Sequence, residues 1–308
     1  MTTNAIQSSH IYSTYFAPRG RSRIYTLGMQ IAQLYLSPFD QIIGFIGEAG
    51  SGKSVLIKGM FPGIELTNDD DGVNVRPLPL LEQEYETGFF TPHTYHLDIR
   101  FETGFHQLSE LADAVRLAVR RGKRIIIEHF DLIYPLLGVN ANLLIGVGEQ
   151  IVITRPNLFG PLPQELCDIV YPSLAYRLMA HSAEDLCEYA MTQEQMLACS
   201  HGDIRHGFVL EFSEHQPDID IPALEARVNE LIREDLPIDY YDESHILLGG
   251  MQHYCTGPRT HVRSTGRIIG FRLLDHFIYD HFHKTYMLVG CVGDDSEENI
   301  RKLETIHG

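Results

Sequence analysis

Paired cysteines and long apolar segments are both missing from this sequence. Its cysteines number five, an odd count, and no two of them form a Cys-x-x-Cys pair. Such a set fits reduced thiols better than a disulfide framework. No apolar run approaches the roughly 20 residues of a membrane-spanning helix, and the first residues lack the basic and apolar stretches of a secretory signal. We therefore expect a cytoplasmic protein that makes no membrane contact.

Basic residues are scarce beside acidic ones. The chain has 24 Lys and Arg against 41 Asp and Glu, which gives a formal net charge of −17. An excess of this size should repel nucleic acids and anionic membranes from the chain as a whole, although a local basic patch could overcome it. With 44% hydrophobic and 21% charged residues, the composition is that of a globular protein and excludes a disordered chain.

The segment 47–54 has the G-x-x-x-x-G-K-[ST] pattern of a phosphate-binding loop. It follows the apolar run 42–46 and leads into Val-Leu-Ile-Lys at 55–58, so a strand, a glycine-rich loop and a helix succeed one another as the motif requires. Glycines let backbone N–H groups turn toward phosphate oxygens, and the start of the helix adds its positive dipole end. The predicted nucleotide contacts are Gly47, Glu48, Ala49, Gly50, Ser51, Gly52, Lys53, Ser54 and Val55.

Two side chains of the loop have specific predicted roles. Lys53 should reach the terminal phosphates, and the hydroxyl of Ser54 should be a ligand of Mg²⁺. The Asn-Lys-x-Asp motif that reads guanine is missing from the chain. We therefore predict ATP, with Mg²⁺, as the bound nucleotide.

Two predicted strands downstream of the loop contain or end in carboxylates. Residues 124–131 begin as an apolar strand and reach Glu128 and then Asp131, while residues 94–101 read as a strand that contains Asp98. In phosphate-loop enzymes such a carboxylate contacts Mg²⁺ through water or acts as the catalytic base. Glu128 is the first candidate, Asp131 the second, and Asp98 an alternative base. A carboxylate that only caps the backbone is the structural alternative.

Other candidates for the same site come from arginines and from two polar segments. Arg155 and Arg177 could clamp phosphates, or could form salt bridges. The acidic segment 68–71 could be a simple turn, or could supply a base or a ribose contact. Residues 77–90 have the loop-like, Glu-rich composition of a mobile lid.

The pattern of elements predicts an α/β fold with two domains. Strands alternate with helices after the loop, which indicates a P-loop NTPase domain with a mostly parallel sheet and helices on both faces. The short strands that follow indicate a smaller α+β domain with a mainly antiparallel sheet. The predicted divisions are an N-terminal extension with a basic turn and a helix (1–40), the P-loop domain (41–203), the α+β domain (205–293) and a polar tail (294–308).

A second group of candidate ligands lies in the rear domain. Cys255 and His261, with His253 nearby, could bind zinc. The alternative is a glycine- and proline-bearing turn that only maintains the fold. A basic trio that could meet a phosphate backbone or a carboxylate follows: Arg259, Arg263 and Arg267.

The pattern Cys-x-x-x-x-x-His-Val-x-x-Thr-Gly-x-Ile-x-x-Phe, which begins at Cys255, resembles the zinc-binding segment of the second additional domain of alanyl- and threonyl-tRNA synthetases. In that editing module a Cys-x-x-x-His pair and a His-x-x-x-His pair hold zinc, and mischarged tRNA is deacylated. Here the spacing from Cys255 to His261 is two residues longer, and no histidine has a partner four residues away. The whole chain resembles bacterial P-loop proteins that carry such a segment, and its front domain is loosely similar to uridine-kinase-type P-loop kinases.

These features support one leading function and two alternatives. The leading hypothesis is a Mg–ATP-dependent phosphotransferase, a kinase for a small-molecule acceptor that the rear domain selects. The alternatives are a nucleotide-gated protein of tRNA binding or aminoacyl editing, and a regulatory NTPase switch. The sequence leaves the acceptor and the oligomeric state open. The predicted catalytic residues are Lys53, Glu128, Asp98 and Arg155.

Overall fold

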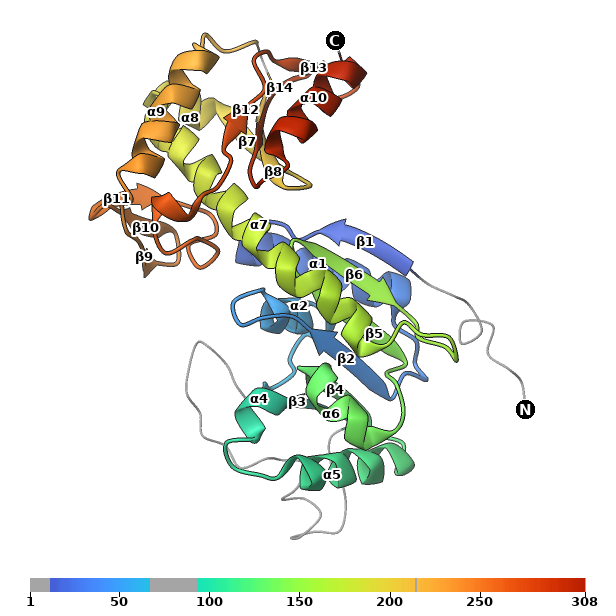
Figure 1. The fold of residues 1–308 in the computed structure, drawn as a ribbon. Coiled ribbons are helices and arrows are strands. Elements are labelled where there is room, and N and C mark those ends of the chain that lie inside the picture. Colours follow the sequence, from blue (N-terminus) through green and yellow to red (C-terminus); the bar gives the residue numbers. More distant parts are fainter. Residues whose placement is uncertain (1–11, 67–92, 214, 308) are drawn as a thin grey trace. The chain divides into compact units, whose positions relative to one another are not determined.

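The computed structural model of the chain describes residues 12–66, 93–213 and 215–307 (Figure 1). Within these stretches the protein is a mixed α/β structure with a six-stranded mixed sheet and further antiparallel sheets. No helix in the described stretches combines the length and the apolar character that crossing a membrane requires. The predicted acidic loop at 68–71 and the predicted lid at 77–90 lie outside the described residues.

The six-stranded sheet has the order β1-β6-β5-β2-β4-β3. β2 is parallel to both β4 and β5, and β3 is parallel to β4, while β6 runs antiparallel to β5. The predicted parallel arrangement therefore holds for the four strands from β3 to β5 in this order. The strands are β1 (Tyr12–Phe16), β2 (Ile42–Ile46), β3 (Thr94–Asp98), β4 (Arg124–Glu128), β5 (Leu143–Val147) and β6 (Gln150–Thr154).

Apolar side chains explain why these strands are buried. All five residues of β2 are buried, as are all five of β5. Because successive side chains point to opposite faces of a sheet, Ile42 and Ile46 join the core that α5, α6 and the start of α7 complete, whereas Ile43 faces the other side. The helices of this part are α1 (Arg21–Tyr35), α2 (Lys53–Met60), α4 (Ile99–Glu102), α5 (Leu108–Arg120), α6 (Phe130–Leu137) and the first part of α7 (Pro163–Ala190).

Helices α1 and α2 cross at very short range. A Cβ atom on Gly59 would lie 2.2 Å from the carbonyl oxygen of Tyr25, and one on Gly28 would lie 2.5 Å from that of Leu56. Real Cβ atoms do not approach so closely, so glycine at both positions permits the contact. This crossing holds the helix that begins at Lys53 against its neighbour.

The remaining strands form two antiparallel sheets. One has the order β12-β14-β8-β7, with β13 also paired to β14, and the other has the order β11-β10-β9. These strands are β7 (Cys199–Ile204), β8 (Gly207–Phe212), β9 (Ile238–Asp242), β10 (His245–Leu248), β11 (Met251–Tyr254), β12 (Arg272–Leu273), β13 (Ile278–Asp280) and β14 (Thr285–Cys291). The helices beside them are α8 (Gln193–Ala198), α9 (Ile221–Arg233) and α10 (Ser296–His307). The predicted antiparallel character of this region is confirmed.

Backbone contacts divide the chain into two compact units. Of the described residues, the first unit contains Tyr12–Tyr15 and those within Arg21–Tyr171, and the second contains Phe16–Gly20 and those from Pro172 onward. The predicted domain border near 203 differs from this division, which falls inside α7. A continuous helical pattern does not reveal such a change of partner, because Val170 packs in the first core and Met179 in the second. The helix at 21–35, predicted as part of an extension, also belongs to the first unit.

Candidate functional site

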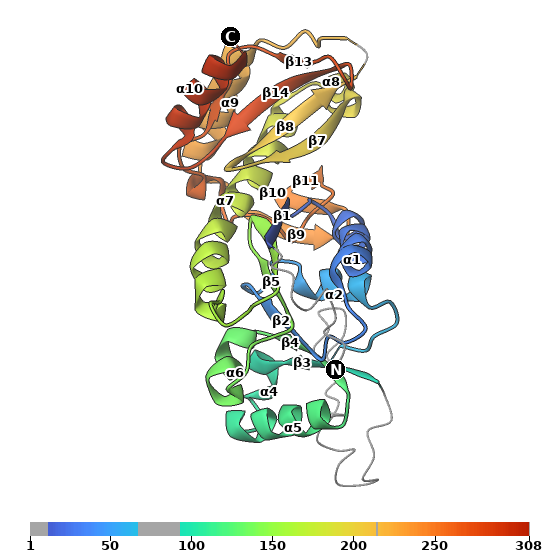
Figure 2. The ribbon, with the colours of Figure 1, turned by 90° about the vertical axis from the view of Figure 1, so that its right-hand side faces the viewer.

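The glycine-rich segment follows β2, a strand that runs parallel to its neighbours on both sides, β4 and β5 (Figure 2). The carboxyl ends of β2, β4 and β5 therefore meet at one edge of the sheet. The chain reaches β4 on one side of β2 and then β5 on the other. In open α/β sheets, ligands bind outside the carboxyl ends of the strands at such a point of divergence.

The backbone of the loop has conformations that favour glycine. Gly47, Gly50 and Gly52 have φ angles of 154°, 79° and 93°. A Cβ atom on Gly47 would lie 2.5 Å from the carbonyl oxygen of Val147, the last residue of β5. Among the described residues, no side chain caps the start of α2 after Gly52. The first N–H groups of this helix, with its positive dipole end, are therefore available to an anion.

Lys53 lies buried over the loop, with 4% of its surface exposed. Its ammonium group donates to the carbonyl oxygens of Gly47 at 3.0 Å and Glu48 at 2.9 Å, and lies 3.7 Å from Oε2 of Glu128. Burial lowers the pKa of Lys53, while the charges of Glu128 and Asp98 oppose that shift. The side chain therefore links the loop to the end of β4.

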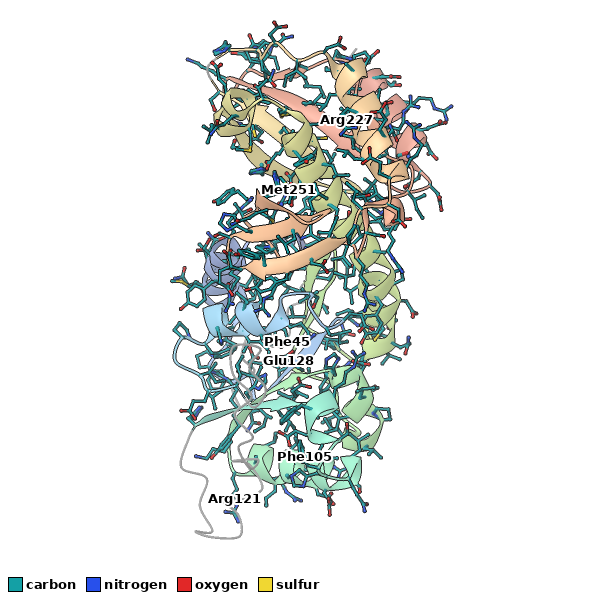
Figure 3. The ribbon with its side chains drawn as sticks, turned by 90° about the vertical axis from the view of Figure 1, so that its left-hand side faces the viewer. Phe45, Phe105, Arg121, Glu128, Arg227 and Met251 are labelled. Carbon is teal, nitrogen blue, oxygen red and sulfur yellow. The ribbon has the colours of Figure 1, made fainter. Side chains whose placement is uncertain are left out.

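Glu128 ends β4 and is 3% exposed. It pairs in register with Phe45 of β2 (Figure 3). Its Oε1 accepts a hydrogen bond from Oγ of Ser54 at 3.1 Å and lies 3.2 Å from Nε2 of His96. Burial raises the pKa of this carboxyl, but the bonds from His96 and Ser54 and the charge of Lys53 outweigh burial and lower the pKa to about 2. The structure thus places a charged carboxylate beside the Ser54 hydroxyl.

Asp98 lies beside Glu128 on the adjacent strand, at the same position in the register. Its Oδ1 accepts from the backbone N–H of Phe101 at 3.2 Å and so caps α4. Asp98, Glu128 and His129 each offer a ligand atom, and these atoms lie within 4.8 Å of one another. Asp131, the second candidate, lies in the first turn of α6 and accepts from the Tyr171 hydroxyl at 3.4 Å.

Sequence reasoning missed His129, which follows Glu128 directly. Its φ of 56° is left-handed, which is uncommon for a residue other than glycine. Nδ1 is buried and has no hydrogen-bond partner within the described part of the chain. Burial, followed by the charges of Lys53 and Arg100, lowers its pKa to about 4, so the ring is neutral at pH 7. Strained and unsatisfied groups concentrate at functional sites, and adjacency to Glu128 was the available signal.

A second missed residue is Arg100, at the start of α4. Its Nη1 donates to Oε2 of Glu48, a residue of the loop, at 2.9 Å. Both side chains are more than two-fifths exposed. This arginine, rather than the two predicted ones, contacts the loop in the first unit.

Arg155 does not lie at the loop. Its guanidinium donates to both oxygens of Asp40 at 2.6 and 2.8 Å, and to the carbonyl oxygens of Tyr35 at 2.5 Å and Asn142 at 3.2 Å. Because β6 is antiparallel to β5, the residue after β6 emerges at the amino ends of the parallel strands. The structure therefore gives Arg155 an architectural contact in place of the predicted phosphate contact. Arg177 belongs to the second unit, where it donates to the carbonyl oxygen of Pro18 at 3.3 Å.

In the second unit the predicted zinc ligands Cys255 and His261 do meet. The Cys255 sulfur lies 3.7 Å from Nε2 of His261, which in turn lies 2.6 Å from Oδ2 of Asp185 on α7. These three residues can offer ligand atoms within 4.8 Å of one another. His253 lies apart from the pair and approaches Glu188 instead, at 3.9 Å.

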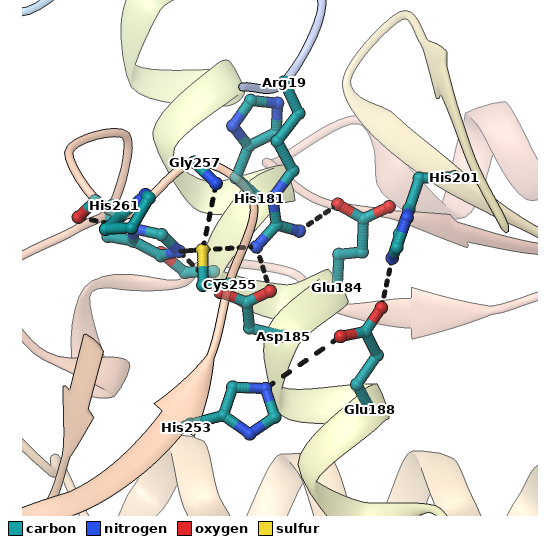
Figure 4. A network of polar contacts seen from close by, with 12 residues as sticks. Arg19, His181, Glu184, Asp185, Glu188, His201, His253, Cys255, Gly257 and His261 are labelled. Atoms are coloured by element: carbon teal, nitrogen blue, oxygen red, sulfur yellow. Dashed lines mark hydrogen bonds and ion pairs between the residues drawn. The ribbon is translucent and has the colours of Figure 1, made fainter. Parts of the chain in front are cut away.

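Arg19 competes for the same ligand atoms (Figure 4). Its guanidinium donates to the Cys255 sulfur at 3.0 Å and also to Asp185 and Glu184. The backbone N–H of Gly257 donates to the same sulfur at 3.2 Å. Burial raises the pKa of the Cys255 thiol to about 12. The pair thus has protein partners already, and zinc there stays a proposal that requires Arg19 to move.

The predicted basic trio is partly engaged within its own unit. The guanidinium of Arg259 lies 4.7 Å from the ring centre of Tyr240 and 3.8 Å from a Glu243 oxygen. Arg263 and Arg267 are exposed. All three arginines are therefore exposed, and Arg259 keeps 46% of its side-chain surface exposed despite these contacts.

Comparison of the chain with protein-family models and with curated proteins finds no match to either. The geometry of the two units therefore carries the functional argument.

Proposed function

We propose that the first unit binds Mg–ATP and transfers its terminal phosphoryl group to a small-molecule acceptor. One observation carries this proposal: the side chains of Lys53 and Ser54 both contact that of Glu128 at the carboxyl end of β2, beside the glycine-rich loop. A role for ATP and Mg²⁺ is consistent with a protein of the cytoplasm. Selection of the acceptor by the second unit is part of the same proposal.

The loop residues fit the phosphates of a nucleotide. Among the described residues, and apart from the two chain neighbours of Gly50, no atom lies within 4 Å of where a Cβ would be, so the backbone there is open to a ligand. The ammonium group of Lys53 donates hydrogen bonds to the carbonyl oxygens of Gly47 and Glu48. A phosphate oxygen is charged and is therefore a stronger hydrogen-bond acceptor for an ammonium group than a carbonyl oxygen. Arg100 could exchange its exposed bond to Glu48 for a phosphate.

The oxygen ligands beside the loop fit Mg²⁺. Ser54 and Glu128 would hold the ion, because a hydroxyl and a charged carboxylate are ligands that Mg²⁺ prefers. Bound Mg²⁺ would supply neutralisation of charge on the phosphates. Glu128, with a pKa of about 2, is a weak base and suits this role better than proton transfer.

Asp98 is the proposed catalytic base. The acceptor hydroxyl oxygen attacks the terminal phosphorus, and the bond from that phosphorus to the bridging oxygen of ADP breaks. The hydroxyl proton passes to the carboxylate of Asp98. This carboxylate lies next to Glu128 in the register of the sheet, so it is close to the proposed ion without being required as its ligand. Positioning and charge stabilisation supply most of the catalysis in reactions of this class.

Nucleotide binding tests the first half of the proposal. A fluorescent ATP analogue should bind the full chain in the presence of Mg²⁺. Lys53→Met should weaken binding by about 10- to 100-fold, since a hydrogen bond to a charged group contributes about 1.5–3 kcal/mol. Lys58→Met, in the same helix, is the matched control and should bind as the wild type does. Equal affinity of the Lys53 and Lys58 variants would overturn the assignment.

Phosphoryl transfer tests the second half. Terminally labelled ATP should label a member of a library of nucleosides, amino acids and cofactors, and Asp98→Asn should abolish transfer while it keeps nucleotide binding. Failure to label any acceptor would contradict the kinase. Slow hydrolysis without transfer would instead favour the regulatory NTPase switch.

A second candidate function concerns the second unit. The approach of Cys255 to His261 favours an aminoacyl-editing or tRNA-binding role, with zinc at that pair. The net charge of −17 opposes binding of tRNA. A gel-shift titration with bulk tRNA at low salt, with and without nucleotide, tests this candidate, and the lack of a shift at micromolar protein would exclude it.

A further inference from the structure

Helix α7 carries three buried carboxylates on the part that belongs to the second unit. Glu184 and Asp185 are 2% exposed and Glu188 is 6% exposed. Arg19 donates to Glu184 and Asp185, and it is a permanent cation. Within the described residues, the hydrogen bonds of Arg19 to side chains go to Glu184, Asp185 and Cys255 and not to Glu188. Burial of a carboxylate without a compensating charge is strongly unfavourable, so Glu188 needs another source of positive charge.

The side chains around Glu188 are metal ligands by type. The sulfur of Cys199 lies 4.0 Å from Oε1 of Glu188, and Nε2 of His201 contacts the same oxygen. Cys199 and His201 are two residues apart on β7, and their partners in the register, Phe212 and Leu210, are both buried. Both side chains therefore lie on the inward face of the strand. The ligand atoms of the three residues lie within 4.8 Å of one another.

His253, from β11, approaches Glu188 from another direction (Figure 4). It is 8% exposed, and its Nε2 lies 3.9 Å from Oε2 of Glu188. Within the described part of the chain this nitrogen has no hydrogen-bond partner. A buried nitrogen left without a partner is unfavourable, and a metal ion bound between it and Glu188 would satisfy both groups.

The chemical types of these ligands favour zinc over the other common divalent ions. Thiolate and imidazole are ligands for zinc, whereas Mg²⁺ and Ca²⁺ prefer oxygen ligands alone. Ligand atoms about 2.0–2.3 Å from a tetrahedral zinc ion are about 3.3–3.8 Å apart. The ligand atoms of Glu188, Cys199 and His201 lie within 4.8 Å of one another, so small side-chain movements bring these three to that spacing. His253 would complete the set by moving toward them from its place 3.9 Å from Glu188.

We propose that Glu188, Cys199, His201 and His253 form a zinc site, called here the Glu188 site, which ties α7 to β7 and β11 of the second unit. The site is separate from the nucleotide loop and from the predicted pair Cys255 and His261. Arg19 already satisfies Asp185 and Cys255. Among the described residues the ion-pair partners of Glu188 are His201 and His253 rather than a permanent cation, and a divalent ion bound between these side chains supplies a lasting positive charge.

Metal analysis of the full chain tests the Glu188 site. Protein purified without chelators should contain about one zinc ion per chain. After removal of zinc and loading with Co²⁺, a sulfur-to-cobalt charge-transfer band should appear. Cys199→Ser should abolish the band, and His201→Gln, at a half-buried position, should weaken zinc binding by at least about 10- to 100-fold. Cys255→Ser is the matched control and should keep both the band and the zinc.

Three results would overturn the proposal. One is a chain that binds neither Zn²⁺ nor Co²⁺ after titration. Another is a cobalt band that survives Cys199→Ser and disappears in Cys255→Ser, which would place the metal at Asp185, Cys255 and His261. The third is unchanged zinc affinity in His201→Gln. Nucleotide binding that each variant retains shows that its first unit is folded. Circular dichroism spectra of the variants, compared with that of the wild type, show whether the second unit is folded as well.

Discussion

At the scale of single residues, the candidate nucleotide site depends on charges that hold one another in place. Glu128 stays ionised inside the protein because Ser54, His96 and Lys53 surround it. The same three neighbours lower its pKa against the opposing effect of burial. The charge on this buried carboxylate therefore depends on all three neighbours, and removal of any one of them should raise the pKa of Glu128.

Glu128→Gln should change how stability depends on pH. The folded pKa of about 2 lies below the unfolded value of about 4.3, so ionised Glu128 stabilises the fold above about pH 4.3. That contribution is lost as the pH falls toward 2. The variant should lose about 1–3 kcal/mol at pH 7 and should show a flatter profile in the acid range. Urea unfolding followed by circular dichroism measures both.

Asp113→Asn is the control for this comparison, since the Asp113 side chain is 77% exposed. It should follow the wild-type profile. A Glu128→Gln profile that keeps the wild-type slope between pH 4 and 2 would show that the carboxylate is not held ionised by its neighbours.

At the scale of elements, the direction of each strand decides which residues gather at the loop. β3, β4 and β2 are parallel, so Asp98, Glu128 and Gly47 emerge at the same edge. β6 runs the other way, and Arg155 therefore meets Asp40 before the start of β2. β4 and β6 both read as apolar strands in the sequence, but β4 brings Glu128 to the loop whereas β6 brings Arg155 to Asp40.

Arg155→Met should destabilise the fold without weakening nucleotide binding. The pair with Asp40 is buried, with 5% and 1% of the side chains exposed. Loss of one member of such a pair leaves an uncompensated buried charge and costs about 3–5 kcal/mol. Thermal unfolding and titration with the fluorescent nucleotide separate the two effects. A stable variant with lost affinity would return Arg155 to the phosphate site.

The turn from β2 into α2 gives a test of the loop itself. Gly47→Ala should destabilise the protein more than Gly50→Ala, because a Cβ at Gly47 meets the backbone of Val147, whereas one at Gly50 meets no described residue within 4 Å other than its chain neighbours. Both positions have positive φ, so each change also carries a strain of about 1–2 kcal/mol. Melting temperatures of the two variants measure the difference, and equal values would contradict the close contact.

At the scale of the whole molecule, the chain combines two units with different chemistry. The first has carboxylates and a hydroxyl beside a glycine-rich loop, and the second has a buried set of thiol, imidazole and carboxylate groups. A hard ion with phosphates suits the first, and a softer ion suits the second. The two proposals can therefore fail independently.

Hydrogen exchange should locate the nucleotide. Addition of Mg–ATP should slow exchange in peptides that contain 47–56, 94–102 and 124–131, because phosphate contacts order backbone N–H groups at the loop and stabilise the strands that end beside it. Protection that omits residues 47–56 would contradict binding at this loop. Lys53→Met provides the control, and its protection should be much smaller at a nucleotide concentration that saturates the wild type but not the weaker-binding variant.

The described fold could be predicted where local patterns suffice. The helix at 108–120 has its apolar residues at helical spacing, and the structure buries Leu111 and Val115 as this spacing requires. The antiparallel region was also predictable from short strands separated by turns. The border inside α7 was not, because a helix that changes its packing partner near Pro172 keeps the same periodicity throughout.

The sequence by itself determined the glycine-rich motif and the prediction that it binds phosphates, because the pattern lies in eight consecutive residues between a strand and a helix. It also determined that Glu128 is a candidate, since an apolar run ends there. Only the tertiary structure decided which distant groups share a site. Arg19 meets Glu184 and Asp185 across 165 and 166 positions of the chain. Contacts at such separation depend on the packing of whole elements, which no local pattern records.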